Sequence, residues 1–165
     1  MKKFILLLIG LYFVSCGGGS NKNAAELWDD GQKYRSEDKL KESITSFKTI
    51  LDKYPSDNFA AEAQFQIADI YLNDVKDFDF AIKEFQKVVE LYPDHEVSKK
   101  SLFMIAYIFN NYLNAYSDAI ITYKLFRKKY PNDELIPSVE YELEGLLKIE
   151  DTIDSLNLMF SKKAK

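Results

Sequence analysis

Apolar residues recur along most of the chain at spacings of three and four, which is the pattern of helices that bury one face. The clearest stretch is residues 81–92, and stripes of the same form cover residues 44–54 and 119–130. A shorter apolar stripe precedes each of the three. No segment alternates apolar and polar residues over the length of a strand. The pattern predicts an all-α protein built of paired helices.

The paired stripes belong to an internal repeat with a period of 38 residues. Tyr-Pro pairs at 54–55, 92–93 and 130–131 keep that spacing. Because proline disfavours helix in the preceding residue and has no N–H to continue one, each pair marks a helix end. Residues of like chemistry recur at the same offset: small Ser43, Ala81 and Ala119, aromatic Phe47, Phe85 and Tyr123, and apolar Ile44, Ile82 and Ile120.

Each unit predicts one helix–turn–helix hairpin, with repeats at 24–57, 58–95 and 96–133. Hairpins at constant spacing stack into a solenoid, so we expect a right-handed solenoid of about three hairpins. The small residue of each unit marks where its two helices approach, and the aromatic residue fills the seam between them. Residues 134–165 are expected to form a C-terminal capping helix pair, with one helix over 138–148 and a second beginning at Asp151.

These units resemble tetratricopeptide repeats over about residues 24–150. The residues of the first unit that match the 34-residue pattern in phase are Leu27, Gly31, Tyr34, Ser43, Phe47, Ile50 and Pro55. The chain departs from the pattern where Asp69 and Tyr107 stand at the position of Gly31, with Ala68 and Ala106 one position earlier. The resemblance implies a protein-binding scaffold in which the first helices of successive units line a concave groove.

Carried onto this chain, the groove would be lined by first-helix residues that lie off the seam. These candidate binding residues are Trp28, Gln32, Arg35, Gln66, Ile70, Asn73, Met104, Ile108 and Asn111. Amide side chains can donate to and accept from an extended peptide backbone, and methionine adapts to varied apolar side chains. The alternative is that the isoleucines and Met104 pack between units and the polar residues are solvated. Trp28 fits a groove position and a packing position equally well.

The N-terminus predicts a signal peptide at residues 1–15. Lys2 and Lys3 precede an apolar run at 4–14, which as a helix spans about 16 Å and is too short for a hydrocarbon core of about 30 Å. The sequence Phe13-Val14-Ser15-Cys16 resembles a bacterial lipobox, with Phe13 where leucine is more usual. That resemblance implies cleavage before Cys16 and covalent lipid, such as palmitate, on this cysteine. No other cofactor is expected.

Residues 16–23 are predicted to be a flexible tether, because glycine and short polar residues cannot bury enough surface to fold. The tether would span about 15 Å on average. Two or more acyl chains hold a protein stably on a membrane. Gly17 stands where some bacteria read an aspartate as an inner-membrane retention signal. We therefore expect a lipid-anchored protein of the cell envelope, on the periplasmic side of the outer membrane.

Charge argues against a nucleic-acid partner. The chain has a formal net charge of −4. Removal of the signal peptide takes away Lys2 and Lys3 and leaves 20 basic against 26 acidic residues. A nucleic-acid partner would usually require a basic face, and anionic lipid would repel this balance. Membrane attachment is expected to depend on the lipid anchor alone.

Catalytic chemistry has little support in the sequence. His95 is the only histidine, and it lies in a polar turn after Pro93. With no second histidine and no cysteine in the repeats, neither a zinc site nor a nucleophile paired with a histidine base can be assembled elsewhere. A glycine-rich phosphate-binding loop is also missing from the sequence. The sequence predicts that the protein is not an enzyme and has no metal site.

A lipid anchor followed by tetratricopeptide-like repeats resembles the BamD-type outer-membrane assembly lipoproteins, although that family usually carries about five repeats. The resemblance implies a scaffold or adaptor that binds other envelope proteins or unfolded segments of outer-membrane proteins. The alternative function is a structural coordinator that links the outer membrane to peptidoglycan, division or secretion machinery.

Overall fold

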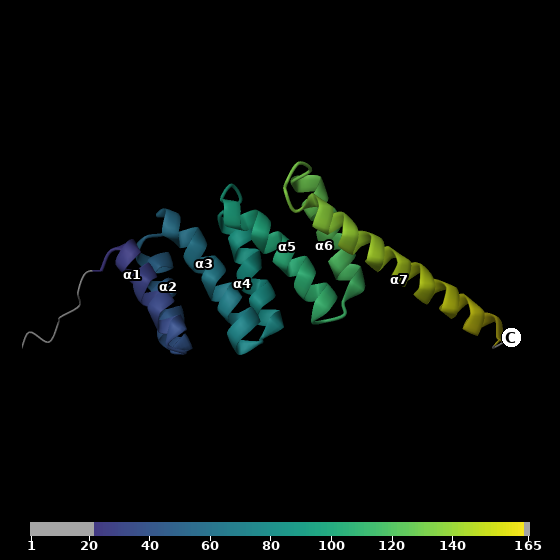
Figure 1. Cartoon of the computed structure of the whole chain (residues 1–165), viewed down its shortest axis with the longest axis horizontal. Helices are drawn as coiled ribbons and strands as arrows, with labels where there is room; N and C mark the ends of the chain where they lie inside the picture. Colours follow the sequence, from purple (N-terminus) through teal and green to yellow (C-terminus); the bar gives the residue numbers. More distant parts are fainter. Residues whose placement is uncertain (1–21, 164–165) are drawn as a thin grey trace, which may run out of the picture.

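The computed structural model describes residues 22–163, and every regular element in that part of the chain is helical (Figure 1). The elements are α1 (Ala24–Ser36), α2 (Leu40–Lys53), α3 (Asn58–Ile70), the π-helical turn η1 (Tyr71–Val75), α4 (Phe78–Leu91), α5 (Glu96–Asn111), α6 (Tyr116–Lys129) and α7 (Ile136–Lys163). Three hairpins, α1–α2, α3–α4 and α5–α6, follow one another along the chain. The predicted all-α solenoid of helix hairpins is confirmed.

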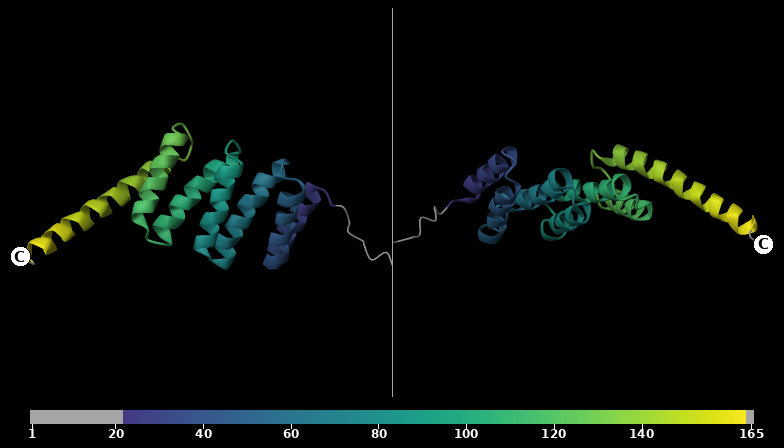
Figure 2. Two further views of the ribbon diagram at one scale, coloured as in Figure 1. Left: turned by 180° about the vertical axis from the view of Figure 1, so that it is seen from behind. Right: turned by 90° about the horizontal axis from the view of Figure 1, so that it is seen from below.

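The hairpins stack side by side along the long axis of the molecule (Figure 2). Each helix packs against the next helix in the chain, and in addition α1 contacts α3 and α3 contacts α5. The first helices of successive hairpins thus adjoin one another. The predicted signal peptide and Cys16 lie outside the described residues. Among the helices of residues 22–163, none is long and apolar enough to cross a membrane.

Each hairpin turns through a residue in the left-handed backbone conformation. The three such residues are Asp38, Lys76 and Asn114, with φ of 58°, 62° and 52°. They are separated by the repeat period, so the same backbone turn recurs in all three units. Each second helix then ends at a Tyr-Pro tyrosine, whose N–H donates to the carbonyl oxygen four residues earlier. The predicted helix ends at these tyrosines are confirmed.

The starts of α3, α5 and α7 repeat as well. Asp57 accepts a hydrogen bond from the Phe59 N–H, and Asp133 accepts one from the Leu135 N–H. His95 occupies the equivalent position, and its Nδ1 accepts from the Val97 N–H over 3.3 Å. A side-chain acceptor at this position satisfies an N–H that the first turn of a helix leaves unpaired. His95 is therefore a helix cap.

The seam between paired helices has the predicted residues. Ala81 and Ala119 are fully buried, as are the aromatic residues Phe47, Phe85 and Tyr123. In the first hairpin, a Cβ added at Gly31 would lie 2.5 Å from a carbon of the Phe47 ring. Ser43 Oγ donates to the Gly31 carbonyl oxygen over 2.8 Å. The small residues allow the close approach, and the aromatic rings fill the space between the helices.

The predicted pair of capping helices is wrong, because α7 is one continuous helix of 28 residues. No turn divides the helix predicted over 138–148 from the one predicted to begin at Asp151. Residues 149–152 include neither proline nor glycine, and side chains such as glutamate are good helix formers. The first part of α7 packs on α6 through buried Val139, Leu143 and Leu146. The rest of α7 projects beyond the last hairpin (Figure 1).

Candidate functional site

The candidate binding residues divide into exposed, half-buried and buried positions. Asn73 and Asn111 are exposed, while Trp28, Gln32, Arg35, Gln66 and Met104 are half-buried. Ile70 and Ile108 have no exposed surface and belong to the hydrophobic core. Their predicted place in an open groove is wrong, since both side chains pack between neighbouring units. The remaining polar positions Gln32, Arg35, Gln66, Asn73 and Asn111 define what we term the first-helix face.

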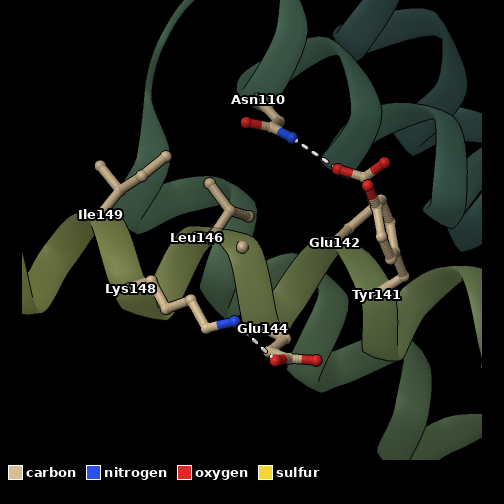
Figure 3. A pocket seen from close by; sticks show the side chains of 8 residues that line it. Asn110, Tyr141, Glu142, Glu144, Leu146, Lys148 and Ile149 are labelled. Atoms are coloured by element: carbon tan, nitrogen blue, oxygen red, sulfur yellow. Dashed lines mark hydrogen bonds and ion pairs between the residues drawn. The ribbon is translucent and has the colours of Figure 1, made fainter.

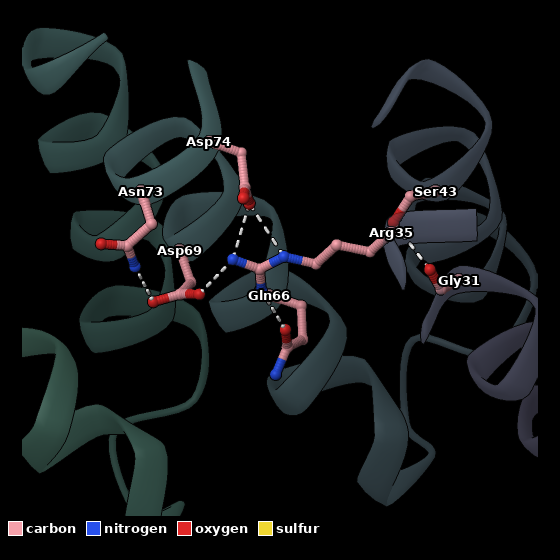
Figure 4. A network of polar contacts seen from close by, with 7 residues as sticks. All are labelled: Gly31, Arg35, Ser43, Gln66, Asp69, Asn73 and Asp74. Atoms are coloured by element: carbon pink, nitrogen blue, oxygen red, sulfur yellow. Dashed lines mark hydrogen bonds and ion pairs between the residues drawn. The ribbon is translucent and has the colours of Figure 1, made fainter. Parts of the chain in front are cut away.

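A polar network crosses this face between the first and second hairpins (Figure 4). Arg35 Nε donates to Asp74 over 2.8 Å, and Nη2 donates to Asp69 over 2.6 Å. Arg35 Nη1 also donates to the Gln66 amide oxygen over 2.9 Å. The Asn73 amide donates to the other Asp69 oxygen over 2.8 Å. Three predicted binding residues therefore meet, and two carboxylates that were not predicted join them.

The charge balance of the network is negative, because Arg35 is shared between Asp69 and Asp74. The three side chains are 21%, 24% and 33% exposed, so they remain in reach of a partner. A guanidinium held by two carboxylates and an amide is fixed in orientation. The network joins the first two hairpins, and its net charge favours a partner that brings N–H donors or cations.

The departure from the repeat pattern at Asp69 signals this network in the sequence. Asp69 stands at the position of Gly31 in the first unit. A carboxylate on the half-buried part of a helix usually requires a cationic partner. Arg35 supplies the cation from the neighbouring hairpin. The irregular position of Asp69 is evident in the sequence, but its pairing with Arg35 is not, because that pairing depends on how the hairpins stack.

Trp28 is a packing residue. Its indole ring lies 5.4 Å, centroid to centroid, from both Phe47 and Phe59. It is therefore held between α2 and the start of α3. The structure favours the packing alternative for this residue over a groove position.

Met104 lines a small hollow between α3, α5 and the start of α7. Phe65, Phe103 and Leu135 form the apolar lining with it. Lys99 and Asp133 form an ion pair over 2.8 Å at the same hollow. The hydrogen bond from Lys99 lowers the pKa of Asp133. The hollow could hold one apolar side chain, which is consistent with the predicted role of Met104.

Two further exposed surfaces were not predicted from the sequence. The ring of Phe78 stacks on Tyr112 with centroids 4.4 Å apart, and Tyr112 is 42% exposed next to Asn111. On the projecting part of α7, Ile153 and Phe160 are 45% and 66% exposed. These α7 residues were expected to pack in a capping pair. They lie open because the chain has no turn to fold them back.

No group of three or more His, Cys, Asp and Glu side chains within residues 22–163 is arranged to hold a metal ion. His95 is occupied with its helix cap, and its Nε2 lies 3.1 Å from the Asn58 amide oxygen. The candidate site is the first-helix face together with the hollow at Met104, which presents both polar and apolar groups.

The chain was compared with families of known proteins. The family described as "SNAP: Soluble NSF attachment protein, SNAP" matches residues 14–140, which is more than half of the chain. No curated protein matches the chain. The family match covers all three hairpins and the start of α7.

Proposed function

We propose that this chain, which belongs to the soluble NSF attachment protein (SNAP) family, is a lipid-anchored adaptor that binds an envelope protein through its first-helix face. The family and the helical-hairpin fold support the coarser statement, that the protein is a scaffold for interactions with other proteins. They give no support to a catalytic role.

The observation that carries the binding proposal is the register of Asn73 and Asn111. Both occupy the position of Arg35 in successive units, one period apart, and both are exposed. Their amides donate to Asp69 and to the Tyr107 carbonyl oxygen respectively. These bonds orient the amides, and each exposed amide oxygen can accept from a partner backbone N–H. Equivalent polar groups at a constant spacing suit an extended segment that runs along the stack.

The flanking groups suggest which segments bind. Asp69 and Asp74 outnumber Arg35 on this face, so lysine or arginine in the partner is favoured. Met104 and Tyr112 offer apolar contacts nearby. The proposed partner is thus an extended segment with basic and apolar residues, such as an unfolded stretch of an outer-membrane protein. A structural link between the outer membrane and other envelope machinery remains the second candidate role.

The test replaces Asn73 and Asn111 with lysine in the full chain. Both positions are solvent-exposed, and a lysine at 73 can pair with Asp69, so the melting temperature should change by less than the equivalent of about 0.5 kcal/mol per site. The added positive charge opposes a basic partner and the amides are lost, so binding of a partner, captured by crosslinking in envelope extracts and then purified, should weaken by at least about tenfold. The matched control carries Thr45→Lys and Gln86→Lys on the second helices. Equal affinity of both double variants for that partner would remove the binding site from the first-helix face.

The anchor is proposed from the lipobox resemblance at Cys16, outside the described residues. Cys16→Ser should abolish metabolic labelling with a fatty-acid analogue and shift the protein from the detergent phase to the aqueous phase. Ser20→Ala, in the tether, is the control and should label like the parent. Labelling of the Cys16→Ser variant would contradict the anchor, whatever the binding face proves to be.

A further inference from the structure

The first hairpin shows how a first helix holds its second helix. On α1, the side towards α2 carries Leu27 and Gly31, which are both buried. The Phe47 ring lies against Gly31, where a Cβ would meet it at 2.5 Å. One turn earlier in α2, Ser43 Oγ donates to the Gly31 carbonyl oxygen. The glycine thus admits an aromatic ring, and the small residue before that ring allows the backbones to approach.

The same side of α7 has no helix packed on it within the described chain. Gly145 lies three repeat periods after Gly31, and Tyr141 stands at the position of Leu27. A Cβ added at Gly145 would meet nothing within 4 Å. Tyr141 is 77% exposed, whereas Leu27 is 8% exposed. In terms of the repeat, α7 is a first helix whose second helix is missing from residues 22–163.

A hollow of about 360 Å³ surrounds Gly145 (Figure 3). Tyr141, Leu146 and Ile149 supply its apolar lining. Leu146 is 2% exposed because it also belongs to the core shared with α6. The hollow is therefore continuous with the stacking interface of the solenoid, and a helix placed there would extend that interface.

Acidic residues dominate the polar rim of the hollow. Glu142 accepts from the Asn110 amide over 2.8 Å and is thereby fixed on one wall. Glu144 pairs with Lys148 over 2.7 Å, which leaves one lysine against two glutamates among the lining residues. A helix with lysine or arginine beside its apolar stripe would match this rim.

The length of α7 fits a docked helix of the size used in the repeats. Each second helix of the three hairpins has 14 residues, or about 21 Å. Beyond the hollow, the same side of α7 continues with Leu156 and Met159, which are 42% and 54% exposed. The side of α7 formed by residues 141–159 spans about 27 Å, enough for one such helix, and it is apolar towards both ends with Lys148 and Thr152 between them.

We propose that this side of α7 is a docking site for an amphipathic, basic helix of a partner protein, which packs as the second helix of a fourth hairpin. The helix would place an aromatic side chain over Gly145 and a small residue one turn before it, as Phe47 and Ser43 do on α1. The site lies on α7, whereas the residues of the first-helix face lie on α1, α3, η1 and α5. It also lies beyond residue 140, where the family match ends.

The test uses a fluorescent peptide with the sequence of residues 40–54, held helical by a staple on its exposed side. This peptide carries Ser43, Phe47 and an excess of lysine over acidic residues. It should bind the full chain saturably in an anisotropy titration. Gly145→Leu should weaken the peptide affinity at least about tenfold by filling the hollow. A peptide with Phe47→Ala should lose a similar factor against the parent chain.

The matched control is Asn157→Leu, which adds the same side chain to an exposed position about 120° around α7 from Gly145. Its peptide affinity should stay within about twofold of the parent. No saturable binding up to about 1 mM peptide would overturn the proposal. Equal affinity of the Gly145→Leu variant would do the same, because the peptide would then bind elsewhere.

A measurement of self-association distinguishes between two occupants of the α7 site, a helix of a partner protein and a second copy of this chain. The parent protein should be monomeric by light scattering, with or without Gly145→Leu. A parent dimer that Gly145→Leu converts to monomer would assign this side of α7 to another copy, and the partner-helix proposal would fail. Loss of first-helix-face binding by the Asn73 and Asn111 variant has no bearing on this result, so the two proposals can fail separately.

Discussion

At the residue scale, Gly31 and Gly145 occupy the same place in the repeat but have opposite surroundings. Gly31 faces the Phe47 ring at a distance that excludes any side chain, while nothing lies within 4 Å of a Cβ at Gly145. Glycine in a helix interior costs about 0.5–1 kcal/mol relative to alanine. At Gly31 that cost is offset by the close packing with Phe47 that glycine permits. At Gly145 no described residue packs against the glycine, so the cost is not offset within residues 22–163.

Alanine at the two glycines should therefore change stability in opposite directions. Gly31→Ala should lower the free energy of unfolding by roughly 1–3 kcal/mol, because the new methyl group overlaps the Phe47 ring. Gly145→Ala should raise it by about 0.5–1 kcal/mol through helix propensity. Urea denaturation followed by circular dichroism measures both. The same sign of change for the two variants would contradict the packing of the first hairpin or the openness of α7.

Tyr123 is the second residue whose surroundings give a direct prediction. It is fully buried, and its hydroxyl has no hydrogen-bond partner among the described residues. Burial also raises the pKa of its phenol. Phenylalanine stands at the equivalent positions 47 and 85. The Tyr123 hydroxyl is thus a buried polar group that is absent from the equivalent residues, Phe47 and Phe85, of the other two units.

Tyr123→Phe should raise the free energy of unfolding by about 1 kcal/mol, since an unsatisfied buried hydroxyl costs about 1–3 kcal/mol. The reverse change, Phe85→Tyr, should lower it by a comparable amount. Thermal unfolding of both variants provides the comparison. A destabilised Tyr123→Phe variant would mean that the hydroxyl has a bonding partner in the folded protein.

At the scale of the elements, the hairpin turn is the feature that repeats most strictly. Asp38, Lys76 and Asn114 all adopt the left-handed conformation. Aspartate and asparagine visit this region more readily than other non-glycine residues, whereas a lysine there bears a cost of about 1–2 kcal/mol. The turn after η1 is therefore the most strained of the three.

Lys76→Asn should stabilise the protein by about 0.5–1 kcal/mol by relieving that strain. Asn114→Lys should destabilise it by a similar amount, because it creates the same strain in the third hairpin. Both side chains are exposed, so the backbone gives most of the difference, and Asn114→Lys also loses the hydrogen bond that Tyr116 Oη donates to Asn114 Oδ1. Chemical denaturation midpoints that do not move in either variant would show that the turns tolerate any residue.

Elements with explicit end signals could be predicted from the sequence, and one without such a signal could not. Pro55 and Pro93 end their helices by the chemistry of proline, and these ends were predicted correctly. Between Lys148 and Thr152 the chain offers polar residues but no breaker, so α7 continues. The turn that was predicted from polar residues alone is wrong, because an exposed helix tolerates polar residues on all sides once its other end is packed.

At the scale of the whole molecule, the repeat period predicted the stacking but not which side chains stay exposed. Ile70 and Ile108 follow the groove register yet are buried, because neighbouring first helices pack closely at that level. Arg35 matches the same register as Asn73 but is bound to the next hairpin by Asp69. Contacts between units depend on the distance between hairpins, and a single sequence does not give that distance.

The central claim is that the protein binds its partner along the first-helix face of the solenoid. Hydrogen–deuterium exchange of the full chain, free and with the purified partner, tests it directly. The account predicts added protection in η1 and in the last turn of α5, around Asn73 and Asn111, with little change in α2, α4 and α6. Protection that appears on the second helices and leaves Asn73 and Asn111 unchanged would contradict it.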